Sequence, residues 1–252
     1  MSSGDIHDLR QPCGSVFRDI TKMQTKQHVP LDGSLMSAKR LDFRFQFLLE
    51  ELIELDAAIE AKDAPGVVDA IIDLVVVAVG ALNEAGVDGQ KAWDEVLRAN
   101  MEKVPGHNAS RADSGGFDLV KPAGWEPPDH SDNVGQLINA FSGERTMPYS
   151  ITALLQAASL QLRKHSDYND NIQRGEYWIH GMDSFEYELN KKHLRFRSIL
   201  SKARRGVEAN FESLEDNLLD KIVYAALALS WLRHREPGQS ADRDLFNKPT
   251  SR

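Results

Sequence analysis

The stretches LLEELIE (residues 48–54) and DAIIDLVVV (residues 69–77) decide the fold of this chain of 252 residues. In the first, apolar residues recur every three or four positions, which predicts one apolar stripe along a helix. The stripe comprises Phe45, Leu48, Leu49, Leu52, Leu55 and Ile59. The second lies in a run from Val67 to Leu82 that is apolar all round, which is typical of a helix enclosed by other helices. An all-α bundle is therefore expected.

Carboxylates lie on both helices, on faces that can oppose each other. Glu50, Glu51 and Glu54 are neighbours on the side of the first helix away from its apolar stripe. Two like charges that lie three or four residues apart on a helix repel by roughly 3 kcal/mol if the effective dielectric is about 20. Asp69 and Asp73 are four residues apart on the apolar helix, where we expect little access to water. A buried ionised carboxylate is costly unless it is paired or binds a metal.

Oxygen ligands without His or Cys nearby suit hard cations. The expected cations are Mg²⁺ or Mn²⁺, which keep several water molecules and bridge to substrate phosphates. Two other interpretations stay open. In the first, the glutamate face is simply solvated. In the second, Asp69 and Asp73 form buried salt bridges with arginines, for which the candidates are Arg40, Arg44 and Arg98.

Three segments in this order resemble the MazG-like all-α nucleoside triphosphate pyrophosphohydrolases. They are E-E-x-x-E at residues 50–54, the acidic pair on the next helix, and WDEVLRANMEK at residues 93–103. The resemblance extends over roughly residues 15–130 and is nearest to the phage and bacterial branch similar to phosphoribosyl-ATP pyrophosphohydrolase. It includes the tail DLVKPAGWEPPD at residues 118–129.

The resemblance implies hydrolysis between the α and β phosphates, which gives a nucleoside monophosphate and pyrophosphate. By position, the catalytic and metal-binding carboxylates are Glu50, Glu51, Glu54 and Asp73. Of these, Glu50 corresponds to a ligand or to a residue that orients the attacking water. Two or three metal ions held here would clamp the triphosphate and lower the pKa of a bound water.

The metal-ligand set departs from the family pattern at one position. Many members have Glu three residues before the aspartate, where this chain has Ala70, and Asp69 is expected to act as a metal ligand instead. Asn100 and Lys103 correspond to residues that contact the phosphates, and Lys103 would neutralise the departing pyrophosphate. Alternatively, Lys103 is a helix-terminal lysine favoured by the helix dipole. For Trp125, stacking on a base and packing of its own loop are both open.

The second half of the chain repeats a sequence pattern of the first, which we call the echo of the acidic pair. DNLLDKIVYAALAL at residues 216–229 again places two carboxylates four residues apart at the start of an apolar helix. The preceding helix lacks the three glutamates and instead has Glu188, Lys192 and Arg195 on one face. Together with the two aspartates, these groups would form a second nucleotide site in which the cations meet phosphate.

A structural explanation of this echo is favoured. Ser213 and Asp216 have the spacing of a capping box, and Asp220 would pair with Arg195. The half also resembles a small all-α domain found with phage nucleotide-modification genes. That resemblance implies a degenerate domain that packs against the first or regulates it.

The expected domain organisation follows the distribution of Pro, Gly and apolar periodicity. The expected helices span about 16–27, 41–62, 66–84, 89–103, 150–166, 183–203 and 213–235, with a short amphipathic piece at 134–141. The expected domains are a MazG-like domain at 1–130, a linker at 131–149, a helical domain at 150–236 and a polar tail at 237–252.

Composition points to an intracellular enzyme. The net charge of −8 argues against stable nucleic-acid binding, and the single cysteine, Cys13, suits a reducing compartment. The apolar runs at residues 74–82 and 224–232 are shorter than the roughly 20 residues of a membrane span. With no secretory signal at the N-terminus, the expected location is the cytoplasm, or the host cytoplasm if the protein is phage-encoded. No membrane partner is expected.

The sequence therefore favours a metal-dependent nucleoside triphosphate diphosphohydrolase that acts on a free deoxynucleotide, with the purines dGTP or dATP preferred. Because three helices cannot easily enclose such a site, and because the family is commonly dimeric or tetrameric, a homo-oligomer is expected. The alternatives are a phosphoribosyl-ATP pyrophosphohydrolase and a non-catalytic helical scaffold or nucleotide-binding protein.

Overall fold

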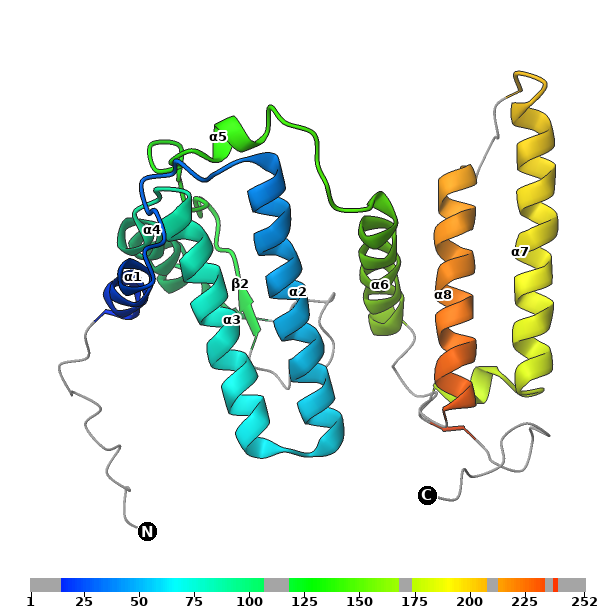
Figure 1. The fold of residues 1–252 in the computed structure, drawn as a ribbon. Coiled ribbons are helices and arrows are strands. Elements are labelled where there is room, and N and C mark those ends of the chain that lie inside the picture. The colour runs from blue at the N-terminus through cyan, green and yellow to red at the C-terminus, as the bar shows by residue number, and fades with distance from the viewer. Residues whose placement is uncertain (1–14, 107–117, 168–173, 208–212, 234–237, 240–252) are drawn as a thin grey trace, which may run out of the picture. The chain divides into compact units, whose positions relative to one another are not determined.

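The computed structural model describes residues 15–106, 118–167, 174–207, 213–233 and 238–239. Figure 1 shows a chain of helices joined by loops. The helices are α1 (Val16–Lys26), α2 (Ala38–Ala61), α3 (Ala64–Glu84), α4 (Gly89–Met101), α5 (Leu137–Ala140), α6 (Tyr149–Asp167), α7 (Met182–Ala203) and α8 (Leu214–Leu232). The expected all-α class is confirmed.

Three short elements of the described chain were not expected from the sequence. The strands β1 (Val104–Gly106) and β2 (Asp118–Val120) pair in a two-stranded sheet, and a 3₁₀-helix spans Arg174–Tyr177. Each has only three or four residues, which is too short for an apolar period to be recognised.

Helix α2 begins three residues earlier than the expected start at residue 41. Ser37 caps it, since its Oγ accepts a hydrogen bond from the backbone N of Arg40 at 3.2 Å. The helix ends at Lys62, which adopts the left-handed conformation with φ of 56°. Helix α3 follows at once with Pro65 in its first turn, where the missing N–H of proline is tolerated. The result is a tight helical hairpin.

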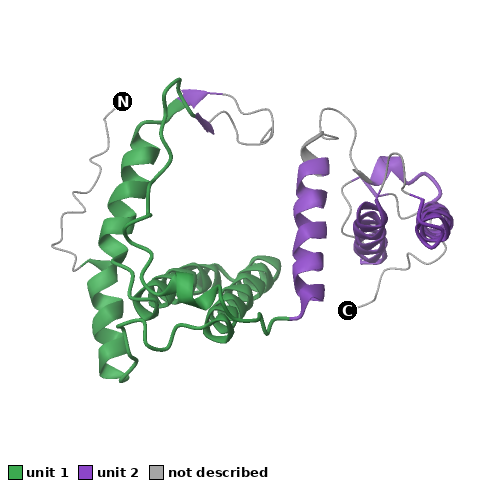
Figure 2. Ribbon diagram, turned by 90° about the horizontal axis from the view of Figure 1, so that it is seen from above, with its two compact units in different colours: residues 1–104, 121–147 green, residues 105–120, 148–252 purple. Residues whose placement is uncertain are grey.

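The chain divides into two compact units, coloured separately in Figure 2. Unit 1 comprises residues 1–104 and 121–147, and unit 2 comprises residues 105–120 and 148–252. Each unit is described below by itself.

In unit 1, α2 and α3 run side by side in opposite directions (Figure 1), and α1 packs against α3. A small core joins the end of α3 to α5, and its buried members are Met36, Ala85, Val87 and Ala140. The segment after Trp125 returns to this core, where the backbone N of Gln136 donates to the carbonyl oxygen of Ala85 at 2.8 Å. Residues 131–147 therefore pack against the rest of unit 1.

In unit 2, α8 packs against both α6 and α7. Its core is aromatic, because the side chains of Phe185 and Trp231 are almost completely buried and their ring centres lie 5.9 Å apart. Val223, Leu227 and Ala157 fill the space around them. This unit thus has its own hydrophobic core.

The sequence predicted that other helices enclose α3, but within a single chain they do not. The buried apolar side chains of α3 are only Ala70, Val77 and Val79. Val68 and Ile72 are 63% and 56% exposed, and Ile71 is 46% exposed. The expectation was wrong for a single chain because α3 carries more apolar positions than α1 and α2 can cover. Leu52 and Ile59 of α2, expected in the core stripe, are also exposed.

By length and composition, α3 could cross a membrane, and it is the only described helix that meets this test. Its mean hydropathy reaches 2.1 over 18 residues, of which 22% are buried. The helix is longer than the apolar run at residues 74–82 because it continues through Asp69 and Asp73. One such helix is weak grounds for a span, and no membrane protein is indicated.

Candidate active site

The hairpin of α2 and α3 brings the two groups of carboxylates level with each other. Glu51 lies eleven residues before the turn residue Lys62, and Asp73 lies eleven residues after it. Because both helices rise equally per residue, these positions meet across the antiparallel pair. Glu54 lies eight residues before Lys62 and Asp69 seven residues after it, so they stand in nearly the same relation, closer to the turn.

Glu51 is half-buried and carries the one buried oxygen atom of this group. Its Oε2 atom is shielded from solvent and has no hydrogen-bond partner among the described residues. Burial raises the pKa of the Glu51 carboxyl, and the negative charges of Glu54 and Asp73 raise it further, as do those of Glu50 and Asp69. The structure therefore brings all five predicted carboxylates into one electrostatic group, contributed by two helices. We call this group the carboxylate cluster.

The other members of the carboxylate cluster are more open to water than expected. Asp69 is exposed and Asp73 is half-buried, although both were expected to be shielded. The reason is the open apolar face of α3, which leaves the start of that helix accessible. Glu50 and Glu54 are also exposed.

The predicted alternative of buried salt bridges to Asp69 and Asp73 is wrong. Arg40 binds Glu84 through Nε and Oε2 at 2.7 Å, and Arg44 binds the other oxygen of Glu84. Burial would raise the pKa of Glu84, but the hydrogen bonds from the two arginines outweigh it and lower the pKa.

The third candidate arginine, Arg98, is also engaged elsewhere. It binds Glu102, directly after its own helix, at 2.9 Å and Glu95, on that helix, at 3.3 Å. In the described part of the chain, no ion pair reaches the carboxylate cluster from a lysine, arginine or histidine. Its negative charge is therefore not neutralised by the residues of unit 1 that the structure describes.

The chemistry of the carboxylate cluster fits a hard divalent cation, because every donor is a carboxylate oxygen and one of these oxygens is buried without a partner. With the side chains as they stand, no group of three or more His, Cys, Asp or Glu residues in the described ranges is placed to hold a metal ion. Mutually repelling carboxylates turn apart unless a cation lies between them. Binding would therefore require side-chain rotation on fixed helices.

Asn100 and Lys103 lie together at the end of α4. The Nζ atom of Lys103 donates to Oδ1 of Asn100 at 2.8 Å. The indole of Trp125 packs beside them, and its Nε1 donates to the carbonyl oxygen of Ala99 at 2.6 Å. Trp125 therefore fastens its own loop to α4. No hydrogen bond or ion pair links Asn100 or Lys103 to the carboxylate cluster among the described residues.

A cavity of about 780 Å³ lies elsewhere in unit 1, between α1, α3 and α4. Its walls are mainly apolar and include Phe17, Val79, Leu82 and Trp93. None of the predicted metal ligands lines it, so it is separate from the carboxylate cluster.

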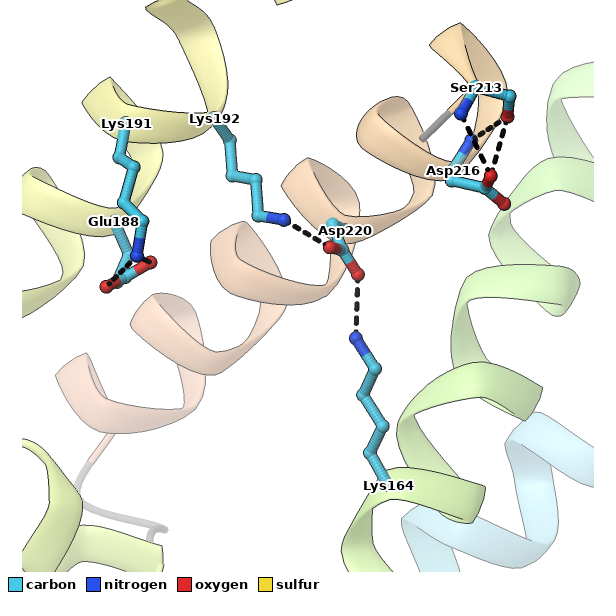
Figure 3. A network of polar contacts seen from close by, with 7 residues as sticks. All are labelled: Lys164, Glu188, Lys191, Lys192, Ser213, Asp216 and Asp220. Carbon is cyan, nitrogen blue, oxygen red and sulfur yellow. Dashed lines mark hydrogen bonds and ion pairs between the residues drawn. The ribbon is translucent and has the colours of Figure 1, made fainter. Parts of the chain in front are cut away.

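In unit 2, the echo of the acidic pair has a structural explanation, shown in Figure 3. Asp216 forms the expected capping box, accepting from the backbone N of Ser213 at 3.2 Å while Ser213 Oγ accepts from the backbone N of Asp216 at 2.9 Å. Asp220 is held by Lys164, at 2.7 Å, and by Lys192.

The expected pairing of Asp220 with Arg195 is thus wrong. The lysine one turn earlier on α7 takes that role, and α6 supplies a second lysine that the sequence did not link to this site. Burial would raise the pKa of Asp220, but the hydrogen bonds from Lys164 and Lys192 lower it. Glu188 is paired with Lys191 at 3.2 Å.

Residues 22–100 match the family model of phosphoribosyl-ATP pyrophosphohydrolase. Over this segment the chain is similar to that all-α, MazG-like family. The match contains α2, α3 and the whole carboxylate cluster, and it ends at Asn100. It supports a nucleotide pyrophosphohydrolase activity in general. No curated protein matches the chain.

The family match stops before Lys103 and before all of unit 2. The likeness of the second half to a phage nucleotide-modification domain therefore stays a prediction. Sequence reasoning also missed Lys121, whose Nζ lies 4.3 Å from the centre of the Trp125 ring. The only signal for it was its place in the segment at residues 118–129, three residues before a glycine and four before the tryptophan.

Proposed function

We propose that unit 1 is the catalytic part of a metal-dependent nucleoside triphosphate pyrophosphohydrolase. The reaction converts a nucleoside triphosphate and water into a nucleoside monophosphate and pyrophosphate. The observation that carries the proposal is the buried Oε2 of Glu51 among four more carboxylates, with no hydrogen-bond partner for this atom and no cationic side chain bound to the group within the part of the chain that the structure describes. Its place inside the matched family segment supports it further.

In this proposal, Glu51, Glu54 and Asp73 hold Mg²⁺ or Mn²⁺, as two or three ions, with Asp69 as a further ligand. Glu50 binds an ion or orients the attacking water. The bound cations would supply positive charge against the triphosphate and lower the pKa of a coordinated water.

The remaining residues act on the phosphates. The amide of Asn100 and the ammonium of Lys103 would bind phosphate oxygens, and Lys103 would offset the charge that builds on the departing pyrophosphate. Their hydrogen bond holds both side chains at the end of α4, which limits the conformational entropy lost when a nucleotide binds.

We further propose that the enzyme works as a homo-oligomer, as a dimer or a tetramer. The support is the apolar surface on the α2–α3 hairpin, where Leu52, Ile53, Val68 and Ile72 are each more than half exposed. Contiguous apolar surface of this kind marks protein–protein contacts in soluble proteins. A second copy would also shelter the carboxylate cluster from water.

For the substrate we propose a free deoxynucleotide, with dGTP or dATP preferred, in phage nucleotide metabolism and in the cytoplasm of the cell. The second candidate is a phosphoribosyl-ATP pyrophosphohydrolase, which the name of the matched family favours. Both would use the same carboxylates on different nucleotides. A purely structural scaffold is less well supported, because a scaffold gains nothing from unneutralised carboxylates.

The test is a panel of common nucleoside triphosphates, their deoxy forms and phosphoribosyl-ATP, each with Mg²⁺ or Mn²⁺, scored for monophosphate and pyrophosphate. We expect Glu54→Gln and Asp73→Asn to lower turnover about 100-fold or more, as the loss of one charge-stabilising group does elsewhere. Asp56→Asn is the matched control, because Asp56 is exposed on α2 outside the carboxylate cluster. Normal turnover by Asp73→Asn would show that the ligand set is wrong.

A further inference from the structure

Two lysine side chains meet on the ring of Trp125. The Nζ atom of Lys121 lies 4.3 Å from the ring centre, and that of Lys103 lies 5.8 Å from it. The two ammonium groups are therefore no farther apart than the sum of these distances. Lys103 follows α4 and Lys121 follows β2, so positions 18 residues apart in sequence converge here.

Neither lysine is bound to a carboxylate among the described residues. Lys103 donates to the neutral amide of Asn100, and Lys121 contacts the indole ring of Trp125. Some lysines of unit 1 are paired with a carboxylate. Lys91, for example, binds Asp132 at 2.6 Å.

The acid nearest to this lysine pair in sequence is already engaged. Glu102, next to Lys103, accepts a hydrogen bond from Arg98 at 2.9 Å. The end of α4 thus presents two positive charges to which no negative side chain of the described ranges is bound.

Simple explanations account for one lysine but not for both. The carbonyl end of α4 favours a cation at Lys103, which lies just beyond the helix. That effect falls off within one helical turn and does not explain a second cation that arrives from a separate loop. The face of an indole attracts either ammonium, yet two like charges at one ring repel each other. An anion between them would remove that cost.

We propose that Lys103 and Lys121 together form an oxyanion site that binds the terminal phosphates of the nucleotide and the pyrophosphate product. This inference rests on the proposed function, to which it adds Lys121. Lysine suits this role because its compact charge sits on a flexible stem and can follow a phosphate as it departs. The ring of Trp125, which is held by its hydrogen bond to the carbonyl oxygen of Ala99, positions both lysine side chains. Asn100 completes the site through its Nδ2 hydrogens.

The test is calorimetric binding of inorganic pyrophosphate to the full-length protein, together with kinetics on its best nucleotide. Lys121→Gln should weaken pyrophosphate binding about tenfold and raise KM by a similar factor, with little change in kcat. It should also reduce the dependence of binding on salt concentration. Lys121→Arg, which keeps the charge, should restore most of the affinity.

The matched control is Lys26→Gln, at an exposed lysine in the last turn of α1, which should bind pyrophosphate as the unaltered protein does. Pyrophosphate binding by Lys121→Gln that equals the unaltered protein would overturn the oxyanion site, and it would leave the hydrolase proposal standing if nucleotides are still cleaved. If no nucleotide is cleaved while pyrophosphate binding still depends on Lys121, the hydrolase proposal fails and the oxyanion site stands.

Discussion

The two acidic pairs of this chain look alike in sequence and stand in opposite environments. Asp69 and Asp73 of unit 1 belong to a carboxylate cluster in which burial and like charges raise the pKa of Glu51. Asp220 of unit 2 lies between two lysines that lower its pKa. Repulsion left unrelieved marks a site poised for a cation, whereas a neutralised carboxylate is a structural link between helices. The same spacing therefore lies in a repulsive carboxylate cluster in one unit, which we propose binds a cation, and in a neutralised link between helices in the other.

The sharpest test of this comparison is Glu51→Gln. The amide removes a negative charge from the carboxylate cluster, so we expect nucleotide turnover to fall by about 100-fold or more. In metal-free buffer, the same change should leave unit 1 as stable as before or more stable, because it relieves repulsion. Hydrogen exchange read by mass spectrometry gives the stability of the α2–α3 hairpin, with Asp56→Asn as control. A clear loss of protection in metal-free Glu51→Gln would contradict this account.

The converse test is Asp220→Asn in unit 2. Asp220 accepts from Lys164 and Lys192, and losing its charge removes an ion-pair partner from each of these lysines. We expect unit 2 to lose about 2 kcal/mol of stability, below the cost for a fully buried pair because Lys164 is 41% exposed. Nucleotide turnover should stay within about twofold, a range that corresponds to less than about 0.5 kcal/mol. Hydrogen exchange across α6, α7 and α8 and a steady-state assay check both parts. A large loss of turnover with unit 2 still folded would show that this half takes part in catalysis.

The smallest expected effect is a pH dependence of opposite sign in the two units. The folded-state pKa of Asp220 lies below its unfolded value of 3.8, so its contribution to stability is complete above that value and is lost as the pH falls below it. The folded-state pKa of Glu51 lies above 4.5, so the metal-free hairpin gains stability as the pH falls through that folded value towards 4.5. Hydrogen exchange corrected for its intrinsic rate, at pH values from 3 to 7, measures both trends. Between pH 7 and 4.5, a metal-free hairpin that does not gain stability as the pH falls would remove the distinction drawn between the units. Below 4.5 both units lose stability, because the pKa of Glu84 in the hairpin is also lowered.

Sequence patterns predicted most of this architecture because helix signals are local. Apolar periodicity and end signals such as Pro65 placed the long helices to within about three residues, an error usual for helix boundaries. The capping box at Ser213 and Asp216 was likewise readable, because its partners are three residues apart. Pairings between distant residues were not readable. Arg40 and Arg44 bind Glu84, and Lys164 reaches Asp220, since ion-pair partners are chosen by the packing of helices.

By itself, the sequence determined the helices, the order of the acidic motifs and the family of residues 22–100, since these depend on residue spacing along the chain. Only the tertiary structure decided which carboxylates stay unneutralised, which apolar face of α3 stays open, and that Lys121 meets Lys103 on one ring. The physical reason is that charge and burial act through distance in space, which depends on how the helices pack and not on sequence separation.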